Sequence, residues 1–492
     1  MEHFDVLIIG AGLSGIGAGA HLRMDCPGKT FTILEGRERS GGTWDLFRYP
    51  GIRSDSDMFT LGYSFRPWKE SKAIADGPSI LNYIHETAQE YDLAKEIRYG
   101  HKVKRAEWSS EDFFWTVTSE TSEGLAYFTA KFIYLCTGYY KYESGFTPDW
   151  PGFGDYKGTV IHPQFWPEDL DYTGKNVLVI GSGATAVTLV PAMTVKATHV
   201  TMLQRSPSYI VSQASQDKIA NFFRTILPSK AAYALSRWKN IIRQAFFYET
   251  SKRYPDFMRR LIAKGVRKEL GNEHLEHHFE PAYKPWDQRV CVVPDADLFE
   301  AMKAGKASVV TGNIETFTES GVQLTNGKML EADIVVTATG LNLKIMSGLE
   351  LVVDGTTVDL STKMAYKGMM YNDVPNLAQA FGYTNASWTL KCDLTSKYVC
   401  RLLKHMDKHG FSTCVARNND PTIEQTPVLD FNSTYIVKVL DELPSQGSKH
   451  PWRLHQNYFK DLSMLRYARL DDGVMEFKTS EVERPAAGNS PT

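Results

Sequence analysis

The chain has 492 residues, a formal net charge of −2 and a hydrophobic content of 42%. This length exceeds what one hydrophobic core usually organises, so we expect two or three domains of a globular protein. Since the net charge is close to zero, the chain as a whole has no field that would attract nucleic acid. A small or uncharged substrate fits this balance better.

Six cysteines are scattered along the chain without a C-x-x-C pair. This pattern indicates free thiols in a reducing compartment and argues against disulfides and against a structural metal site. The first residues lack the basic region and long apolar stretch of a signal peptide, and no apolar run approaches the roughly 20 residues that span a bilayer. We therefore expect a cytoplasmic protein.

The first chemical motif follows a short β-branched run at residues 5–9. It reads G-x-G-x-x-G, with Gly10 for a tight turn, Gly12 for the approach of a pyrophosphate and Gly15 for close helix packing; Ser14 lies in the same loop. Glu35 follows about 20 residues later, where a carboxylate accepts hydrogen bonds from ribose hydroxyls. Strand, loop, helix and acid together predict a dinucleotide site.

A second strand–loop–helix unit begins at residue 176. The end of its next predicted strand carries Arg205 and Ser206 in place of a carboxylate, and an arginine can bind a 2′-phosphate, so this site favours NADPH over NADH. Two sites of different ribose preference suit an enzyme in which NADPH reduces a bound flavin. The residues predicted to contact NADPH in the loop and first turns are Ser182, Gly183, Ala184, Thr185, Ala186, Val187 and Thr188.

The order of elements predicts an α/β fold with two dinucleotide-binding, Rossmann-like domains and a helical insertion. A segment rich in aromatic and basic residues, roughly 219–270, forms the insertion. We divide the chain into a first part of the FAD domain (1–145), a first part of the NADPH domain (146–211), the insertion (212–288), a second part of the NADPH domain (289–340) and a second part of the FAD domain with the tail (341–492).

Two longer fingerprints carry a family resemblance. Gly41-Gly42-Thr43-Trp44 through Tyr49-Pro50-Gly51 to Asp55 resembles the Baeyer–Villiger signature G-G-x-W-x-x-x-x-[F/Y]-P-G-x-x-x-D without a gap. Tyr156-x-Gly158-x-x-x-His162-x-x-x-Trp166-Pro167 is similar to the second fingerprint, with Tyr in place of the usual Phe. The chain thus resembles type I Baeyer–Villiger flavin monooxygenases, in particular a bacterial subgroup that activates thioamide prodrugs.

The resemblance implies FAD and NADPH as cofactors and a ketone converted to an ester or lactone through a flavin C4a-peroxide, with side activity on sulfides and thioamides. It assigns Arg289 to stabilise the negative charge that develops on oxygen and Asp55 to position Arg289, with Asp57 as a weaker competitor for that role. The segment expected to line the cofactors consists of Thr43, Trp44, Asp45, Leu46, Arg53, Ser54 and Asp55, with Val103 near the adenine of FAD.

Further positions of the same resemblance concern domain contacts. His162 and Trp166 are expected to couple domain motion to the cofactor, not to transfer protons. Asn385 and Trp388 are expected near the flavin ring. Trp452 lies either in a loop over NADP⁺ or in simple packing.

Several alternatives stay open. A flavin-containing monooxygenase acting mainly on soft sulfur or nitrogen would share the cofactors, although Trp166-Pro167 favours the Baeyer–Villiger type. A flavin disulfide reductase would need two neighbouring redox cysteines, and a nucleotide-sensing protein would not need the full first fingerprint. The expected partners are dioxygen and a small apolar ketone, sulfide or thioamide. The basic, aromatic insertion is either solvated or in peripheral contact with a membrane.

Overall fold

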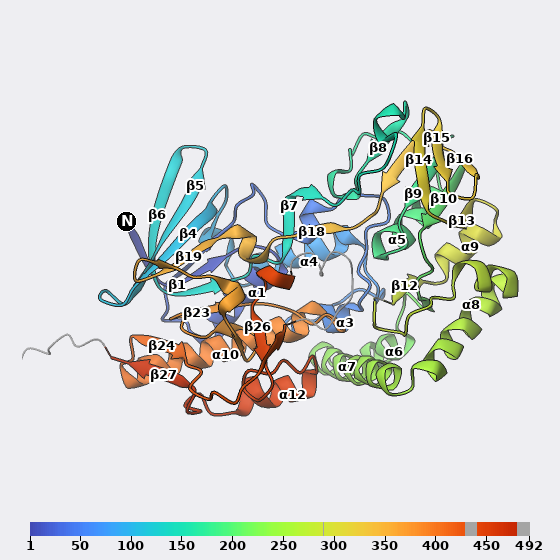
Figure 1. Ribbon diagram of the computed structural model, residues 1–492. Coiled ribbons are helices and arrows are strands. Elements are labelled where there is room, and N and C mark those ends of the chain that lie inside the picture. Colours follow the sequence, from blue (N-terminus) through green and yellow to red (C-terminus); the bar gives the residue numbers. More distant parts are fainter. Residues whose placement is uncertain (289, 429–439, 480–492) are drawn as a thin grey trace, which may run out of the picture.

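The computed structural model describes residues 1–288, 290–428 and 440–479. Its larger sheet is built around β1, which pairs in parallel with β2 on one side and with β6 on the other. This sheet occupies the left half of Figure 1. Its strands, in sheet order, are β20 (Thr356–Thr357), β19 (Glu350–Val353), β4 (Lys102–Ser109), β5 (Phe114–Thr121), β6 (Gly124–Leu135), β1 (Glu2–Ile9), β2 (Phe31–Leu34) and β3 (Ile97–Arg98), with β23 (Leu377–Gln379) also paired to β6.

Helix α1 (Leu13–Asp25) follows β1 and lies against α10 (Trp388–His409), which belongs to the carboxyl-terminal part of the chain. Its glycines permit close contacts: a Cβ on Gly17 would lie 2.8 Å from the ring of Tyr63. The remaining elements of this half are α2 (Thr43–Leu46), α3 (Met58–Leu61), α4 (Gly77–Glu90), β21 (Ala365–Tyr366), β22 (Met370–Tyr371), β24 (Thr413–Ala416), β25 (Gln425–Pro427), β26 (Ser445–Gly447), α12 (Tyr458–Leu462) and β27 (Met475–Lys478).

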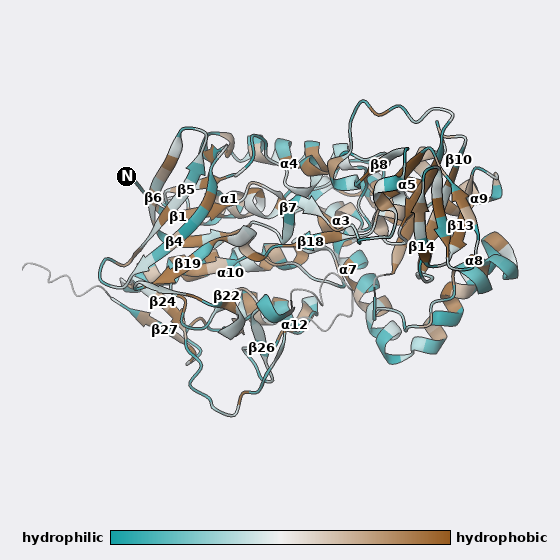
Figure 2. Cartoon of the chain, turned by 45° about the horizontal axis from the view of Figure 1, so that its top comes forward, coloured by the Kyte–Doolittle hydropathy of each residue, from teal (hydrophilic) through white to brown (hydrophobic). Residues whose placement is uncertain are grey.

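A second sheet of five parallel strands forms the upper right part of Figure 1. Its strands are nearly continuous apolar runs, as expected for a parallel sheet that is covered on both faces; Figure 2 shows them in brown. In sheet order they are β13 (Ala307–Thr311), β10 (His199–Gln204), β9 (Asn176–Ile180), β17 (Ile334–Thr337) and β8 (Thr159–Ile161); α5 (Ala184–Met193), α9 (Asp297–Lys303) and the antiparallel strands β14 (Ile314–Thr318), β15 (Gly321–Leu324) and β16 (Met329–Glu331) complete the unit.

The chain passes between the two units along an antiparallel pair of strands, β7 (Tyr140–Gly145) and β18 (Leu341–Leu343). The segment that leaves and re-enters the second unit is framed by a parallel pair, β11 (Ile210–Gln213) and β12 (Cys291–Pro294). Three helices lie between them: α6 (Lys218–Ile226), α7 (Ser229–Arg253) and α8 (Pro255–His278), the last interrupted at Gly271.

Two α/β dinucleotide units and a helical insertion are therefore present, which confirms the predicted fold class. The domain boundaries given above stay a prediction. All six cysteines are buried, and none of them forms a disulfide. In the part of the chain that the structure describes, no helix is both long and apolar enough to cross a membrane.

Candidate active site

One cavity of about 780 Å³ connects the two dinucleotide loops. Gly10 and Gly12 line it from the end of β1, and Ala184, Thr185 and Thr188 line it from α5. Since both loops open into the same space, the structure brings together the two motifs that lie about 170 residues apart in the sequence.

The first loop has the shape that a pyrophosphate site needs. Gly10 has φ 103°, and a Cβ there would lie 2.6 Å from the carbonyl oxygen of Cys136; a Cβ on Gly15 would lie 1.8 Å from the carbonyl oxygen of Gly10. Gly12 differs, because the nearest atom to its Cβ position is 3.5 Å away, in Gly42. Gly10 and Gly15 thus serve the turn and the helix packing, while Gly12 leaves open backbone at the helix N-terminus, where a phosphate fits.

Glu35 follows β2 and faces the same cavity. One carboxylate oxygen accepts a hydrogen bond of 2.7 Å from the backbone N–H of Ala11, and the other accepts one of 3.0 Å from the N–H of Arg37. Burial raises the pKa of Glu35 in spite of these bonds. Each oxygen keeps a free lone pair, so the carboxylate is able to accept hydrogen bonds from ribose hydroxyls.

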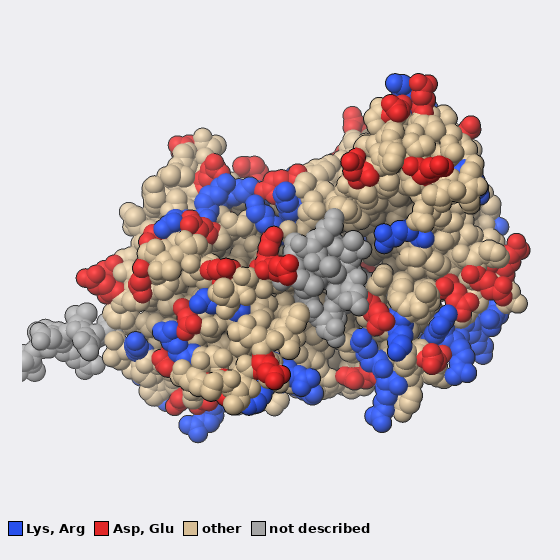
Figure 3. All heavy atoms as spheres, viewed as in Figure 1, with Lys and Arg blue, Asp and Glu red and all other residues tan. Residues whose placement is uncertain are grey.

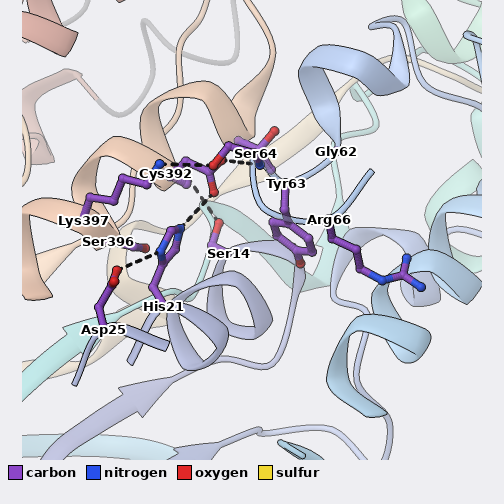
Figure 4. Close-up of polar contacts among 12 residues, drawn as sticks. Ser14, His21, Asp25, Gly62, Tyr63, Ser64, Arg66, Cys392, Ser396 and Lys397 are labelled. Carbon is purple, nitrogen blue, oxygen red and sulfur yellow. Dashed lines mark hydrogen bonds and ion pairs between the residues drawn. The ribbon is translucent and has the colours of Figure 1, made fainter. Parts of the chain in front are cut away.

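Ser14 is held by groups from α10 (Figure 4). The indole N–H of Trp388 donates to its hydroxyl over 2.8 Å, and the Sγ of Cys392 lies 3.5 Å from the same oxygen. Ser14, Asn385 and Trp388 all line the cavity. The start of α10 is therefore a wall of the site, where Asn385 and Trp388 were expected.

A buried ion network lies behind this wall. Asp393 accepts hydrogen bonds from His21 (3.3 Å), from the backbone N–H of Ser64 (2.7 Å) and from Arg237 of α7 (3.2 Å). Burial opposes protonation of His21, but its contacts with Asp25 and Asp393 outweigh this effect and raise its pKa. Figure 4 shows His21 between Asp25 and α10. The network joins α1, α10 and the insertion.

The second loop resembles the first. Gly181 has φ 137°, and a Cβ there would lie 2.2 Å from the carbonyl oxygen of Ala338, whereas a Cβ on Gly183 would meet nothing within 4 Å. The hydroxyls of Ser182 and Ser208 form a hydrogen bond of 2.8 Å. The residues predicted to contact NADPH have three different locations. Ala184, Thr185 and Thr188 line the cavity, whereas Ala186 and Val187 are buried in the core. Arg205 and Ser206 are exposed just after β10.

The first fingerprint is the segment that touches both loops. A Cβ on Gly42 would lie 3.0 Å from the Cα of Gly12, and a Cβ on Gly51, which has φ 76°, would lie 2.6 Å from the Cβ of Ala192 in α5. Tyr49 lies between these glycines and makes a side-chain hydrogen bond with Thr185; its burial raises its pKa to about 12. The G-G-x-W to P-G spacing thus places one short segment against both dinucleotide loops at once.

Within this fingerprint, Thr43, Trp44, Arg53, Ser54 and Asp55 line the cavity. Arg53 forms an ion pair with Asp297 at the start of α9. Val103 of β4 also lines the cavity, on the side of Glu35.

Asp45 and Leu46 were predicted to line the cofactor and do not face the cavity. The carboxylate of Asp45 is buried and pairs with Arg37, at 2.8 Å, and with Arg48. Leu46 packs against the core of the second unit. Both residues therefore pack on the side of the segment that faces away from the cavity. Arg289 lies outside the described residues, so its predicted role stays a prediction.

Asp57 was the weaker candidate for positioning Arg289. It lines the cavity, but both of its carboxylate oxygens accept hydrogen bonds from the protein. It caps α3 by accepting from the N–H of Thr60, and it accepts hydrogen bonds from Asn240 (3.0 Å) and Gln244 (2.9 Å) of α7. Asp57 therefore ties the insertion to the first unit.

The aromatic content of the insertion predicts an apolar cavity, but sequence reasoning did not single out the residues of the wall that the insertion contributes. Gln244 and Phe247 of α7, together with Trp286, line the cavity. Three buried polar atoms have no hydrogen-bond partner in the protein: Gln244 Oε1 and the indole N–H of Trp286 in this wall, and Asn385 Oδ1 in the neighbouring wall beside α10. Because buried polar atoms are normally satisfied, these three fit a site whose ligands bring complementary groups. Only the aromatic content of the insertion hinted at this wall.

His162 lies at the passage between the units. Its Nε2 is 3.0 Å from the carbonyl oxygen of Gly340, and its ring fills the space beside Gly145, where a Cβ would lie 2.0 Å from the ring. Trp166 is buried against Tyr172. Trp452 is buried against Tyr366 and does not line the cavity, so of its two predicted locations the structure shows packing.

Comparisons with known proteins agree with this geometry. A model of the flavin-binding monooxygenase-like family matches residues 63–408, and a model of an NAD(P)-binding Rossmann-like domain matches residues 8–73. The chain is 51% identical over 487 residues to the FAD-containing monooxygenase EthA of Mycobacterium tuberculosis, covering 99% of each chain. It is 49% identical over 488 residues to a probable FAD-binding monooxygenase, AlmA, of Acinetobacter baylyi, covering 98% of each.

Solved structures share the fold. One is an oxidised steroid monooxygenase bound to NADP, with a TM-score of 0.71 and 24% identity over 84% of this chain and 87% of that one. Another is cyclohexanone monooxygenase in an open form, with a TM-score of 0.71 and 19% identity over 85% of this chain and 90% of that one. The matches confirm the family resemblance and the expectation of a flavin and a nicotinamide dinucleotide as cofactors. The chain belongs to the flavin-binding monooxygenase-like family.

Proposed function

We propose that this protein is an FAD-containing, NADPH-dependent Baeyer–Villiger monooxygenase that converts apolar ketones to esters or lactones. The observation that carries the proposal is the single cavity shared by both dinucleotide loops and by an aromatic wall from the insertion. In the overall reaction, ketone, dioxygen, NADPH and a proton give ester, NADP⁺ and water. Sulfides and thioamides are secondary substrates.

The first loop would hold FAD. The open backbone at Gly12 and the N-terminus of α1 would bind its pyrophosphate, Glu35 its ribose, and Val103 would lie near its adenine. Thr43, Trp44 and Trp388 would line the ring system. Bound FAD supplies the redox chemistry, taking a hydride from NADPH and activating dioxygen.

The second loop would hold NADPH. Gly183 leaves space at the N-terminus of α5 for the pyrophosphate, and Arg205 is exposed where a 2′-phosphate would lie after β10. The fingerprint segment, packed on both loops, would set the distance between the two cofactors. Arg53 is held by Asp297 beside the same space.

The substrate would face the wall of the insertion. Phe247 packs edge-to-face on Trp286 at 6.3 Å, and Tyr248 does so at 5.4 Å, which orients the indole of Trp286. Its N–H would donate to a substrate or cofactor oxygen. The family resemblance assigns Arg289 to stabilise the negative charge that develops on oxygen. A donor fixed in a cavity that excludes water stabilises developing negative charge more than the same donor in water.

The test is turnover of purified holoprotein with NADPH and a panel of 2-octanone, cyclohexanone, phenylacetone and an aryl methyl sulfide. Ester or lactone, detected by gas chromatography, would support the proposal. Arg289→Ala should lower ester formation about 100- to 1,000-fold while NADPH still reduces the flavin, and Arg253→Ala, a variant of an exposed arginine at the end of α7, should match the wild type.

Other product patterns would refute the proposal. Sulfoxide alone across a broad ketone panel would indicate a monooxygenase for soft nucleophiles. Hydrogen peroxide alone would indicate an NADPH oxidase. Equal ester formation by the wild type and Arg289→Ala would remove the role of Arg289.

A further inference from the structure

The three helices of the insertion have a charge that differs sharply from that of the whole chain. Residues 218–278 contain thirteen Lys and Arg against five Asp and Glu, whereas the chain has a net charge of −2. The rest of the molecule is therefore acidic, and the positive charge is concentrated on α6, α7 and α8. Figure 3 shows Lys and Arg gathered at the lower right, where Figure 1 draws α7 and α8.

The same helices expose large apolar side chains at helical spacing. On α7 they recur as Leu235, Trp238, Ile242 and Phe246, which places them on one face of the helix, and Phe246 is 72% exposed. On α6 they are Ile219, Phe222 and Ile226. At the start of α8 they are Tyr254, its N-cap residue, Phe257 and Leu261. Each helix thus presents an apolar row to solvent; we call these ten residues the apolar rows.

Basic side chains continue the apolar row of α8. On α8, Lys264 and Lys268 lie on the same helical face as Phe257 and Leu261, about one and two turns beyond Leu261. They are exposed, as is Arg267. Among the described residues, the ion pairs of the insertion use other cations, such as Lys239 with Asp217 and Arg259 with Glu280. The lysines that follow the apolar row therefore keep their charge available.

We propose that the exposed face of α6–α8 docks on the surface of an anionic lipid bilayer. Helices with apolar residues on one face and Lys and Arg at its border insert the apolar row at the headgroup boundary and attract anionic lipids. A second copy of the chain fits less well, because a symmetric contact would bring two positive faces together. A nucleic acid would use the charges but would leave the aliphatic residues Ile219, Ile226 and Leu261 exposed.

The docking face is separate from the cavity wall. Gln244 and Phe247 of α7 line the cavity, while Ile242 and Phe246 are not part of its lining. Substitution of the exposed residues therefore leaves the site intact, and the inference is testable whether or not the ketone activity holds.

The experiment is flotation of full-length holoprotein with vesicles of phosphatidylcholine alone or with 30% phosphatidylglycerol, at low and high salt. We expect at least tenfold stronger binding to the anionic vesicles and a marked loss at high salt. Phe222→Ser, Ile242→Ser and Phe246→Ser combined should weaken binding at least tenfold. The matched control is Leu125→Ser with Tyr127→Ser, two residues of similar exposure on β6.

A charge variant tests the second half of the argument. Lys264→Gln, Arg267→Gln and Lys268→Gln together should weaken binding to the anionic vesicles several-fold and reduce its salt dependence. Flavin content and melting temperature verify that each variant is folded.

Three results would overturn the inference. The wild type could fail to bind anionic vesicles at low salt. The triple serine variant could bind as the wild type does. Light scattering could show, without lipid, a dimer that the serine variant dissociates, which would assign the face to a second copy.

Discussion

The Gly183→Ala variant separates cofactor binding from folding more cleanly than any other change in the site. Gly183 has φ −81°, which alanine adopts freely, and a Cβ there would meet no atom within 4 Å. We therefore expect the free energy of unfolding to change by less than about 1 kcal/mol. The new methyl would lie where the NADPH pyrophosphate must approach the helix, and loss of one charge-assisted hydrogen bond costs about 1.5–3 kcal/mol. This predicts a roughly 10- to 100-fold rise in the Kd for NADPH.

The assay is anaerobic stopped-flow reduction of the bound flavin at increasing NADPH, with flavin absorbance and a thermal melt on the same sample. Gly28→Ala is the control, because a Cβ on Gly28 also meets nothing within 4 Å and this residue follows α1, outside both dinucleotide loops. An unchanged Kd for NADPH, or loss of FAD in place of NADPH binding, would contradict the assignment of the second loop.

Three further predictions concern selectivity, folding and pH. Arg205→Ala should raise KM for NADPH about 10- to 100-fold and leave KM for NADH nearly unchanged in steady-state assays, and equal effects on both would refute the 2′-phosphate contact. Gly15→Ala should destabilise the protein by at least about 1–3 kcal/mol and release FAD, because its Cβ would lie 1.8 Å from the Gly10 carbonyl oxygen; an unshifted melting curve would contradict this. His21 has a raised pKa, so its stabilising contribution is complete below its ordinary value of 6.5 and is lost as the pH rises through the raised value. Asp393→Asn should cost about 3–5 kcal/mol and flatten this pH dependence in denaturant titrations.

The parts of the fold that were predictable are those encoded by local spacing. Gly10 and Gly15 follow a β-branched run at a spacing typical of a strand–turn–helix, with Glu35 at the expected distance, and the structure has that turn. The second loop follows the same rule. Local spacing also separates the insertion, since its aromatic and basic residues lack the pattern of either sheet.

The parts that were missed depend on contacts between distant residues. Asp45 occurs in a segment that lines the site, but Arg37 and Arg48 hold its carboxylate away from the cavity. Gln244 lines the site because Asp57, 187 residues earlier, accepts its N–H. Such pairs leave no periodic trace in one sequence, so their partners are identified only when the chain is folded.

The first fingerprint gains a physical meaning from these contacts. Its leading glycines abut Gly12 of the first loop, and its last glycine, Gly51, lies against Ala192 in the helix of the second. Tyr49, which lies between these glycines in the sequence, makes a side-chain hydrogen bond with Thr185. A reaction that passes a hydride between two bound dinucleotides requires their reactive ends to meet at a fixed distance. Because one segment packs on both loops, any movement of one unit relative to the other must deform it. We therefore propose that the fingerprint acts as a spacer between the two dinucleotide loops, and not only as a set of separate ligand contacts.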